Sequence, residues 1–146
     1  MRDGVVVAVC LSRKARLPRQ NAGEGRLAPG VGLIGDAGSA LACGVISLLA
    51  LEQIERANRK FGLDATPGTF GEHLTIEGGR LSDLATGDRL KVGEARLEVI
   101  RVGDPEAFVH LNAYRGVSLL PRWGVYCRVL DPGRVQKGDP VHYLAD

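Results

Sequence analysis

The spacing of apolar residues divides the chain into one helical segment and several short extended segments. Residues 4–11, GVVVAVCL, form a continuous apolar run that ends before Ser12, which predicts a buried strand. Between residues 45 and 61, VISLLALEQIERANRKF, apolar positions instead repeat with the period of a helix. The apolar face of this predicted helix consists of Ile46, Ala50, Ile54, Ala57 and Phe61. Gly62 follows, where a left-handed glycine commonly ends a helix.

The second half of the chain has the pattern of short strands joined by turns. Residues 88–93 and 95–102 predict a hairpin that turns at Gly93 and Glu94, because apolar and charged residues alternate before and after the turn. The remaining predicted elements are strands near 74–76 and over 124–130 and 139–144, a turn at 131–134 and a short helix over 104–114. We therefore expect a mostly β (α+β) fold with one main helix, closed as a β-barrel, in a single domain over residues 1–146.

A polar segment separates the first predicted strand from the glycine-rich stretch that follows it. Residues 12–30 contain two prolines and three glycines, and we expect a long loop there. Its basic side chains are Arg13, Lys14, Arg16, Arg19 and Arg26. Two interpretations stay open: a solvated loop that needs no partner, or an anion site in which arginines hold a phosphate by paired contacts.

Composition indicates a globular protein in a reducing compartment. The chain is 45% hydrophobic and 25% charged, with a net charge of +2, which is too small to indicate polyanion binding. Aromatic residues make up 5% and do not interleave with the basic loop, so nucleic acid is not an expected partner. The three cysteines form no CxxC pair, and no apolar run reaches the roughly 18 residues of a membrane span. We expect a soluble cytoplasmic protein without a membrane partner.

Common short motifs of catalysis and nucleotide binding give no specific chemistry. Gly30, Gly32 and Gly35 satisfy GxGxxG, but no predicted strand precedes them and no helix opens on them, so flexible turns are the better interpretation. No Walker lysine, GxSxG or zinc-deaminase motif is present. The three histidines, His73, His110 and His142, do not have the spacing of metal ligands.

Several phrases along the chain resemble the MOSC domain, the family named for the C-terminal part of molybdenum cofactor sulfurase. They are GEGRLAPGVGLIGDA, SLLALEQIE, TPGTFGEHLTIEG, LSDLATGDRLKVGEARLEV and GVYCRVLDPGRVQKGD, in the family's order and over nearly the whole chain. The pattern is most similar to small, free-standing bacterial MOSC proteins. The resemblance implies a β-barrel with one main helix, in agreement with the pattern of apolar residues.

The resemblance also implies a ligand. MOSC proteins are associated with a molybdopterin-type molybdenum cofactor, with sulfur carriage and, in some members, with pyridoxal phosphate. A catalytic member would be a cofactor-linked reductase or a sulfur-transfer protein, with a molybdoenzyme or redox protein as a possible partner besides its small-molecule ligand. In such proteins a cysteine thiolate is the metal ligand or sulfur carrier, because soft sulfur binds molybdenum and only the deprotonated thiol reacts.

Comparison with the family pattern gives five candidate cofactor-binding residues, for each of which a structural role stays open. They are Asp36, Ser47, Glu72, His73 and Arg128. Asp36 could instead form a turn, Glu72 could bond loop backbone, and His73, which replaces the asparagine of the usual FGENLT, could satisfy its own loop. Arg128 matches the family's RVL and could bind an anion or pair with an acid such as Asp139.

The family thiol itself is missing. Glu106 stands about where relatives have a cysteine, and a carboxylate is a harder ligand that cannot carry sulfur. Cys43 falls near a family histidine and is a candidate reactive thiol, although a small buried side chain is the alternative. Cys127 and Cys10 are expected to be buried and inert. The second functional hypothesis is therefore a non-catalytic scaffold or regulatory module that keeps the MOSC fold.

Overall fold

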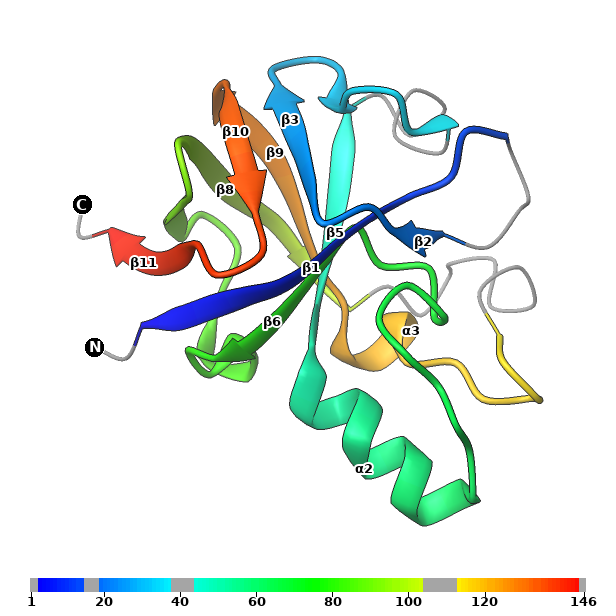
Figure 1. Cartoon of the computed structure of the whole chain (residues 1–146). Coiled ribbons are helices and arrows are strands. Elements are labelled where there is room, and N and C mark those ends of the chain that lie inside the picture. The colour runs from blue at the N-terminus through cyan, green and yellow to red at the C-terminus, as the bar shows by residue number, and fades with distance from the viewer. Residues whose placement is uncertain (1–2, 15–18, 38–43, 104–112, 145–146) are drawn as a thin grey trace.

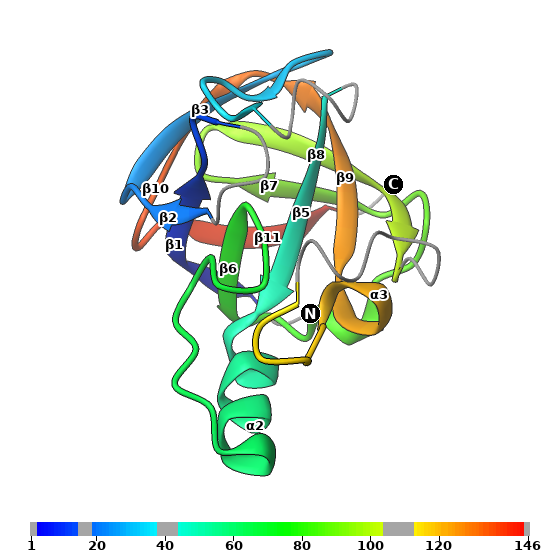
Figure 2. The same cartoon turned by 90° about the vertical axis from the view of Figure 1, so that its right-hand side faces the viewer.

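Seven strands of the chain close into a mixed β-barrel (Figures 1 and 2). The computed structural model describes residues 3–14, 19–37, 44–103 and 113–144. The barrel strands follow the order β11-β7-β8-β9-β5-β6-β1, and β1 pairs with β11 to close the ring. Their bounds are β1 Gly4–Leu11, β5 Val45–Ala50, β6 Leu74–Gly78, β7 Arg89–Val92, β8 Ala95–Val102, β9 Val125–Asp131 and β11 Pro140–Leu144. The mostly β barrel predicted from the sequence is confirmed.

Strand connections explain why the barrel is mixed. β5 and β6 are parallel, with Leu48 opposite Leu74, and the main helix α2 (Leu51–Phe61) lies in the connection between them. The other pairs of adjacent barrel strands are antiparallel. The predicted hairpin of β7 and β8 turns at Gly93, which has φ +56° and where a Cβ would lie 2.5 Å from the Asp139 carboxylate.

A smaller sheet, β10-β3-β4, packs against one end of the barrel. Its strands are β3 (Glu24–Ala28), β4 (Gly32–Leu33) and β10 (Gly133–Gln136). A separate two-residue strand, β2 (Gln20–Asn21), pairs antiparallel with the last residues of β1. The apolar side chains of Leu27, Leu33 and Val135 join the main core. The small sheet therefore covers apolar surface that the open end of the barrel would otherwise leave to solvent.

Two apolar clusters lie on opposite sides of β5. Alternate side chains of a strand point to opposite faces, so Ile46 and Leu48 enter the barrel core while Leu49 faces outward. The outer cluster lies between β5, α2 and the helix α3 (Leu120–Trp123) and consists of Leu49, Ile54, Ala57, Ala65, Phe70, Leu119 and Leu120. A short 3-10 helix, η1 (Leu81–Asp83), contributes Leu81 to the barrel core.

The predicted helix over 45–61 is wrong in its first third. Residues 45–50 form β5, which pairs with β6 along one edge and with β9 along the other, and its side chains are buried on both faces, so neither face is polar and open to solvent. A short buried apolar run does not distinguish strand from helix by its periodicity. Ile54 and Ala57 are buried as predicted, whereas Phe61 is 52% exposed. Gly62 ends the helix in the left-handed conformation, with φ +64°, as predicted.

The loop predicted over residues 12–30 and the turn at 131–134 are also wrong in part. Residues 24–27 of β3 pair antiparallel with residues 133–136 of β10, and Gly25 lies opposite Val135. Such a pairing spans most of the chain and has no local signal in sequence. The short helix predicted over 104–114 lies, apart from its last two residues, outside the described part of the chain. Within the described ranges, no helix has both the length and the apolar character needed to cross a membrane.

Truncating α2 at one buried and one exposed position tests how the helix packs. Ile54→Ala should lower the free energy of unfolding by about 3 kcal/mol, because the side chain is 1% exposed and leaves a cavity. Phe61→Ala removes a larger side chain that is 52% exposed, and its effect should stay near 0.5 kcal/mol, as is usual for surface positions. Urea unfolding followed by circular dichroism measures both; equal losses would contradict the described orientation of α2.

Candidate functional site

A buried carboxylate, Asp36, lies where four segments of the chain meet on the outside of the barrel. Its partners are Ser12 after β1, Arg19 before β2 and His73 immediately before β6, and His73 in turn contacts Ser47 of β5. Asp36 is 3% exposed and His73 is 4% exposed. The structure thus brings three of the five sequence candidates together, Asp36, Ser47 and His73, and adds Arg19. We call these four residues the Asp36 network.

Asp36 accepts two hydrogen bonds at each carboxylate oxygen. Oδ1 accepts from the Ser12 backbone N–H at 2.8 Å and from Arg19 Nε at 3.0 Å. Oδ2 accepts from Arg19 Nη2 at 3.0 Å and lies 3.0 Å from His73 Nε2. The Arg19 contact is therefore the paired arrangement in which a guanidinium and a carboxylate fit best. These donors occupy the usual acceptor capacity of both oxygens.

Backbone contacts fix the protonation of His73. The Ser47 N–H donates to His73 Nδ1 at 2.9 Å, so Nδ1 carries no proton and Nε2 is the N–H that donates to Asp36. Burial lowers the pKa of His73 to about 4, and it outweighs the opposing effect of the Asp36 carboxylate. His73 is therefore a neutral donor near pH 7.

Asp36 stays ionised although it is buried. Burial by itself raises the pKa of this carboxyl, but hydrogen bonds from His73 and Arg19 outweigh burial and hold the pKa well below its usual range. The Arg19 guanidinium balances the negative charge, and the network as a whole is close to neutral. Such pairing is what allows a charged group to be kept out of water.

The network joins loops that are far apart in the sequence. Arg19 Nη1 donates to the Gly71 carbonyl, and the Ala37 N–H donates to the Ser12 carbonyl at 2.9 Å. The sequence indicates Arg19 only as one charge of a basic loop, because its partner lies 17 residues away and no local pattern marks the pair. Arg13 and Lys14 of the same loop are exposed, and Arg26 is exposed on β3.

Glu72 is buried next to the network but belongs to a separate set of contacts. Its Oε2 accepts from the Gly68 N–H at 3.1 Å and from the Thr75 hydroxyl at 2.6 Å, which agrees with the bonding to loop backbone considered from the sequence. Its Oε1 is buried and has no hydrogen-bond partner in the described chain. Burial raises the pKa of Glu72.

Arg128 lies apart from the other candidates. It stands on β9 opposite Glu98 of β8, and its Nη2 lies 2.6 Å from the Glu98 carboxylate. Its side chain is 59% exposed. The acid it contacts is thus Glu98 rather than Asp139, whose carboxylate accepts the Gln136 N–H.

The two described cysteines are held as thiols. Burial, together with the neighbouring Glu72, raises the pKa of Cys10 to about 12, and burial raises the pKa of Cys127 further above its ordinary value. Both thiols are 0% exposed, so neither is a thiolate nucleophile or soft metal ligand near neutral pH. Cys43 and Glu106 lie outside the described residues.

The other sequence motifs have structural roles where they are described. Gly30, Gly32 and Gly35 lie in and beside the β3–β4 hairpin with φ between +74° and +89°, as the turn interpretation required. His142 lies on β11 with Nδ1 3.0 Å from the Asp3 carboxylate, and His110 is outside the described ranges. Among the described residues, no group of three or more His, Cys, Asp or Glu side chains could hold a metal ion.

Comparison with known proteins identifies the fold. The family model described as MOSC domain matches residues 35–142. The sequence matches none of the curated proteins with which it was compared.

Solved structures of three bacterial proteins have a similar fold. The chain resembles YiiM from Geobacillus stearothermophilus with a TM-score of 0.71 and 19% identity, over 97% of this chain and 75% of that one. It resembles the YuaD protein from Bacillus subtilis with a TM-score of 0.70 and 18% identity, over 99% of both chains. For YiiM from Escherichia coli the TM-score is 0.65 and the identity 23%, over 100% of this chain and 71% of that one.

Removing the charge of Asp36 should destabilise the protein strongly. Asp36→Asn leaves the Arg19 guanidinium without its carboxylate in a largely buried place, and we expect a loss of about 3–5 kcal/mol in the free energy of unfolding. The matched control is Asp131→Asn, which breaks an exposed pair with Arg96 and should have little effect. Chemical unfolding measures both variants, and similar losses would show that the network does not hold the loops.

The lowered pKa of His73 predicts acid sensitivity. Between pH 6.5 and about 4 the unfolded chain takes up a proton at this histidine and the folded chain does not, so stability falls as pH falls through this window. The loss should reach about 3 kcal/mol. His73→Asn, which restores the family's usual residue, lacks this titration. The measurement is the free energy of unfolding at about pH 7 and about pH 4.5 for both proteins; parallel pH dependence would contradict a buried neutral His73.

Proposed function

Because this chain belongs to the MOSC family, we propose that it binds a molybdopterin-type cofactor or another phosphate-bearing small ligand. In this proposal the Asp36 network holds the loops that surround the ligand. It acts as a positioning frame and does not contact the reacting atoms. The protein would then act as a ligand-binding module, without thiol chemistry at Cys10 or Cys127.

One observation carries this proposal: a saturated, buried ion network at the junction of four loop segments. A buried ion pair contributes little net stability compared with well-packed apolar side chains, so stability alone does not explain its presence. The network does hold the segments after β1, after β4 and before β6 in one arrangement. Fixing loops around a binding site is what such hydrogen-bonded shells do in other proteins.

The described residues fit the phosphate of such a cofactor but not its metal. Exposed Arg13 and Lys14 stand beside the network and can meet a phosphate at the surface. The described thiols do not fit the metal, because both are buried and protonated. Asp36 and His73 use their polar atoms within the network. We therefore assign Arg13 and Lys14 the binding of an anionic group, assign the network the orientation of the loops, and derive no chemical step.

The buried thiols favour a second candidate function. A MOSC protein with Glu106 near the family's cysteine position, and with Cys10 and Cys127 inert, can serve as a non-catalytic scaffold or regulatory module. Such a module would keep the barrel for contact with another protein and would carry no bound cofactor.

The molybdenum and phosphorus content of the purified protein tests the proposal. The full chain is expressed in cells that make the molybdenum cofactor, and molybdenum and phosphorus are measured by elemental analysis. We expect close to one equivalent of these elements per chain in the wild type and a much lower content in Arg19→Gln. The control Arg96→Gln removes an exposed arginine outside the network and should keep the wild-type content. If Arg19→Gln does not fold by circular dichroism, Arg19→Lys replaces it, because lysine keeps the charge but cannot make the paired contact with Asp36.

Two results would overturn the proposal. Wild-type protein that is folded but contains neither molybdenum nor phosphorus would favour the scaffold. A folded Arg19→Gln variant with an unchanged load would show that the network does not position the ligand.

A further inference from the structure

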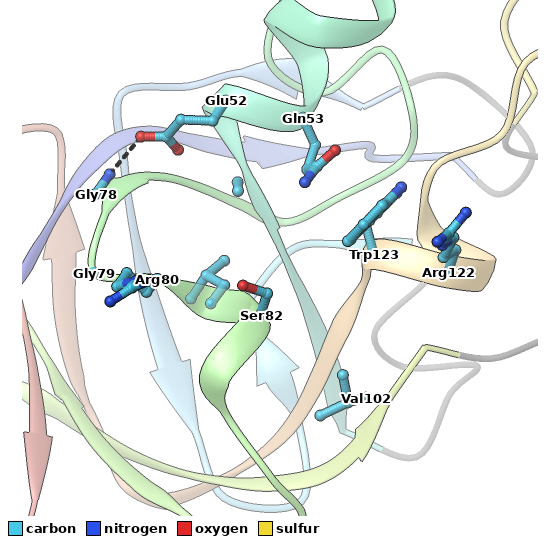
Figure 3. Close-up of a pocket in the computed structure, with 11 residues that line it drawn as sticks. Glu52, Gln53, Gly78, Gly79, Arg80, Ser82, Val102, Arg122 and Trp123 are labelled. Atoms are coloured by element: carbon cyan, nitrogen blue, oxygen red, sulfur yellow. Dashed lines mark hydrogen bonds between the residues drawn. The ribbon is translucent and has the colours of Figure 1, made fainter.

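A second site candidate lies where β5 passes into α2. A pocket of about 360 Å³ opens there between α2, the turn after β6 and the helix α3 (Figure 3). Glu52 and Gln53 border it from α2, Arg80 and Ser82 from the opposite side, and Trp123 with Arg122 from α3. This volume is in the range of small-ligand sites.

We propose that this pocket binds a small ligand that combines a planar aromatic ring with a phosphate or carboxylate group. None of the four residues of the Asp36 network lines the pocket. The inference therefore stands apart from the function proposed above, and each can fail without the other.

The apolar part of the pocket suits a flat ring. Trp123 is half-buried, and Ala50, Leu81 and Val102 add apolar surface. Val102 is 40% exposed although it is a large apolar residue at the end of β8. An indole offers both stacking area and an N–H donor to a planar ligand. A ligand ring on Trp123 would cover apolar surface that is now open to solvent.

The charged side chains of the pocket favour an anion. Arg122 lies with its guanidinium 4.8 Å from the centre of the Trp123 ring, and it has no carboxylate within 4.0 Å in the described chain. Glu52 already accepts the Gly78 N–H at 2.8 Å. Among the residues that the structure describes, Arg80 makes an exposed ion pair with Asp83 at 3.4 Å and no other. The two arginines can therefore turn to a phosphate or carboxylate without breaking a buried ion pair.

The backbone at Arg80 supports a binding role. Arg80 has φ +50° and follows Gly78 and Gly79, which have φ +71° and +73°. Glycine adopts this left-handed conformation without cost, whereas an arginine side chain is strained there. Residues held in such conformations cluster at ligand-binding and active sites. At this position a glycine would suit the backbone better, and the arginine places a positive charge at the pocket.

The only tryptophan of the chain reports directly on this pocket. Adenosine monophosphate, phenyl phosphate, adenosine and inorganic phosphate are each titrated into the full chain while Trp123 fluorescence is followed. We expect saturable changes with the two aromatic phosphates, weakened by added salt. Adenosine and inorganic phosphate, which each lack one half of the proposed ligand, should bind at least tenfold more weakly.

Substitutions of the two pocket arginines test how the anionic group of the ligand is bound. Arg122→Gln should raise the dissociation constant at least tenfold, and the matched surface variant Arg96→Gln should leave it unchanged. Arg80→Gly should weaken binding while the thermal midpoint of unfolding stays or rises, because glycine relieves the backbone.

Three results would overturn the inference. The first is no saturable response to either aromatic phosphate. The second is adenosine binding as tightly as its phosphate. The third is equal binding by Arg122→Gln and Arg96→Gln.

Discussion

The fold depends on β1 being paired along both of its edges. β1 pairs with β6 over Gly4–Val9 and with β11 at Gly4 and Val5, and the second pairing turns a curved sheet into a ring. Closure satisfies backbone groups that an open edge would expose. It also gives each barrel strand an inner and an outer face, because side chains alternate along a strand. The inner faces form the core, and the outer face of β5 carries Ser47, the strand residue of the polar network.

The sequence predicted elements whose signal is local. The strand at residues 4–11, the hairpin around Gly93 and the end of the helix at Gly62 each depend on neighbouring residues, and each is present. β3 and β10 were missed because their pairing joins residues about 110 positions apart. β5 was assigned to the helix because a run of six residues between two strands has no polar face to show its period.

In the candidate site, too, the sequence predicted residues with a local signal and missed those that only the fold brings together. Family-like phrases pointed to Asp36, Ser47 and His73, and these three lie in one network. The role of Arg19 could not be predicted, because only the folded chain brings its guanidinium to Asp36. Arg128 matched a family phrase equally well, yet it lies on the surface beside Glu98. Similarity to the family's sequence motifs therefore identifies segments near the site, and the folded structure shows which of their side chains are in contact.

The alternation along β5 limits how this surface can change. Ile46 and Leu48 fill the barrel while Ser47, between them, holds His73. Shifting the register of the strand by one residue would turn the serine inward and both aliphatic side chains outward, so core and network would be lost together. A substitution that keeps an apolar side chain of similar size at Ile46 or Leu48 preserves this alternation, whereas a change in the length of the strand does not. Length variation has to occur in the connections beyond either end of the strand.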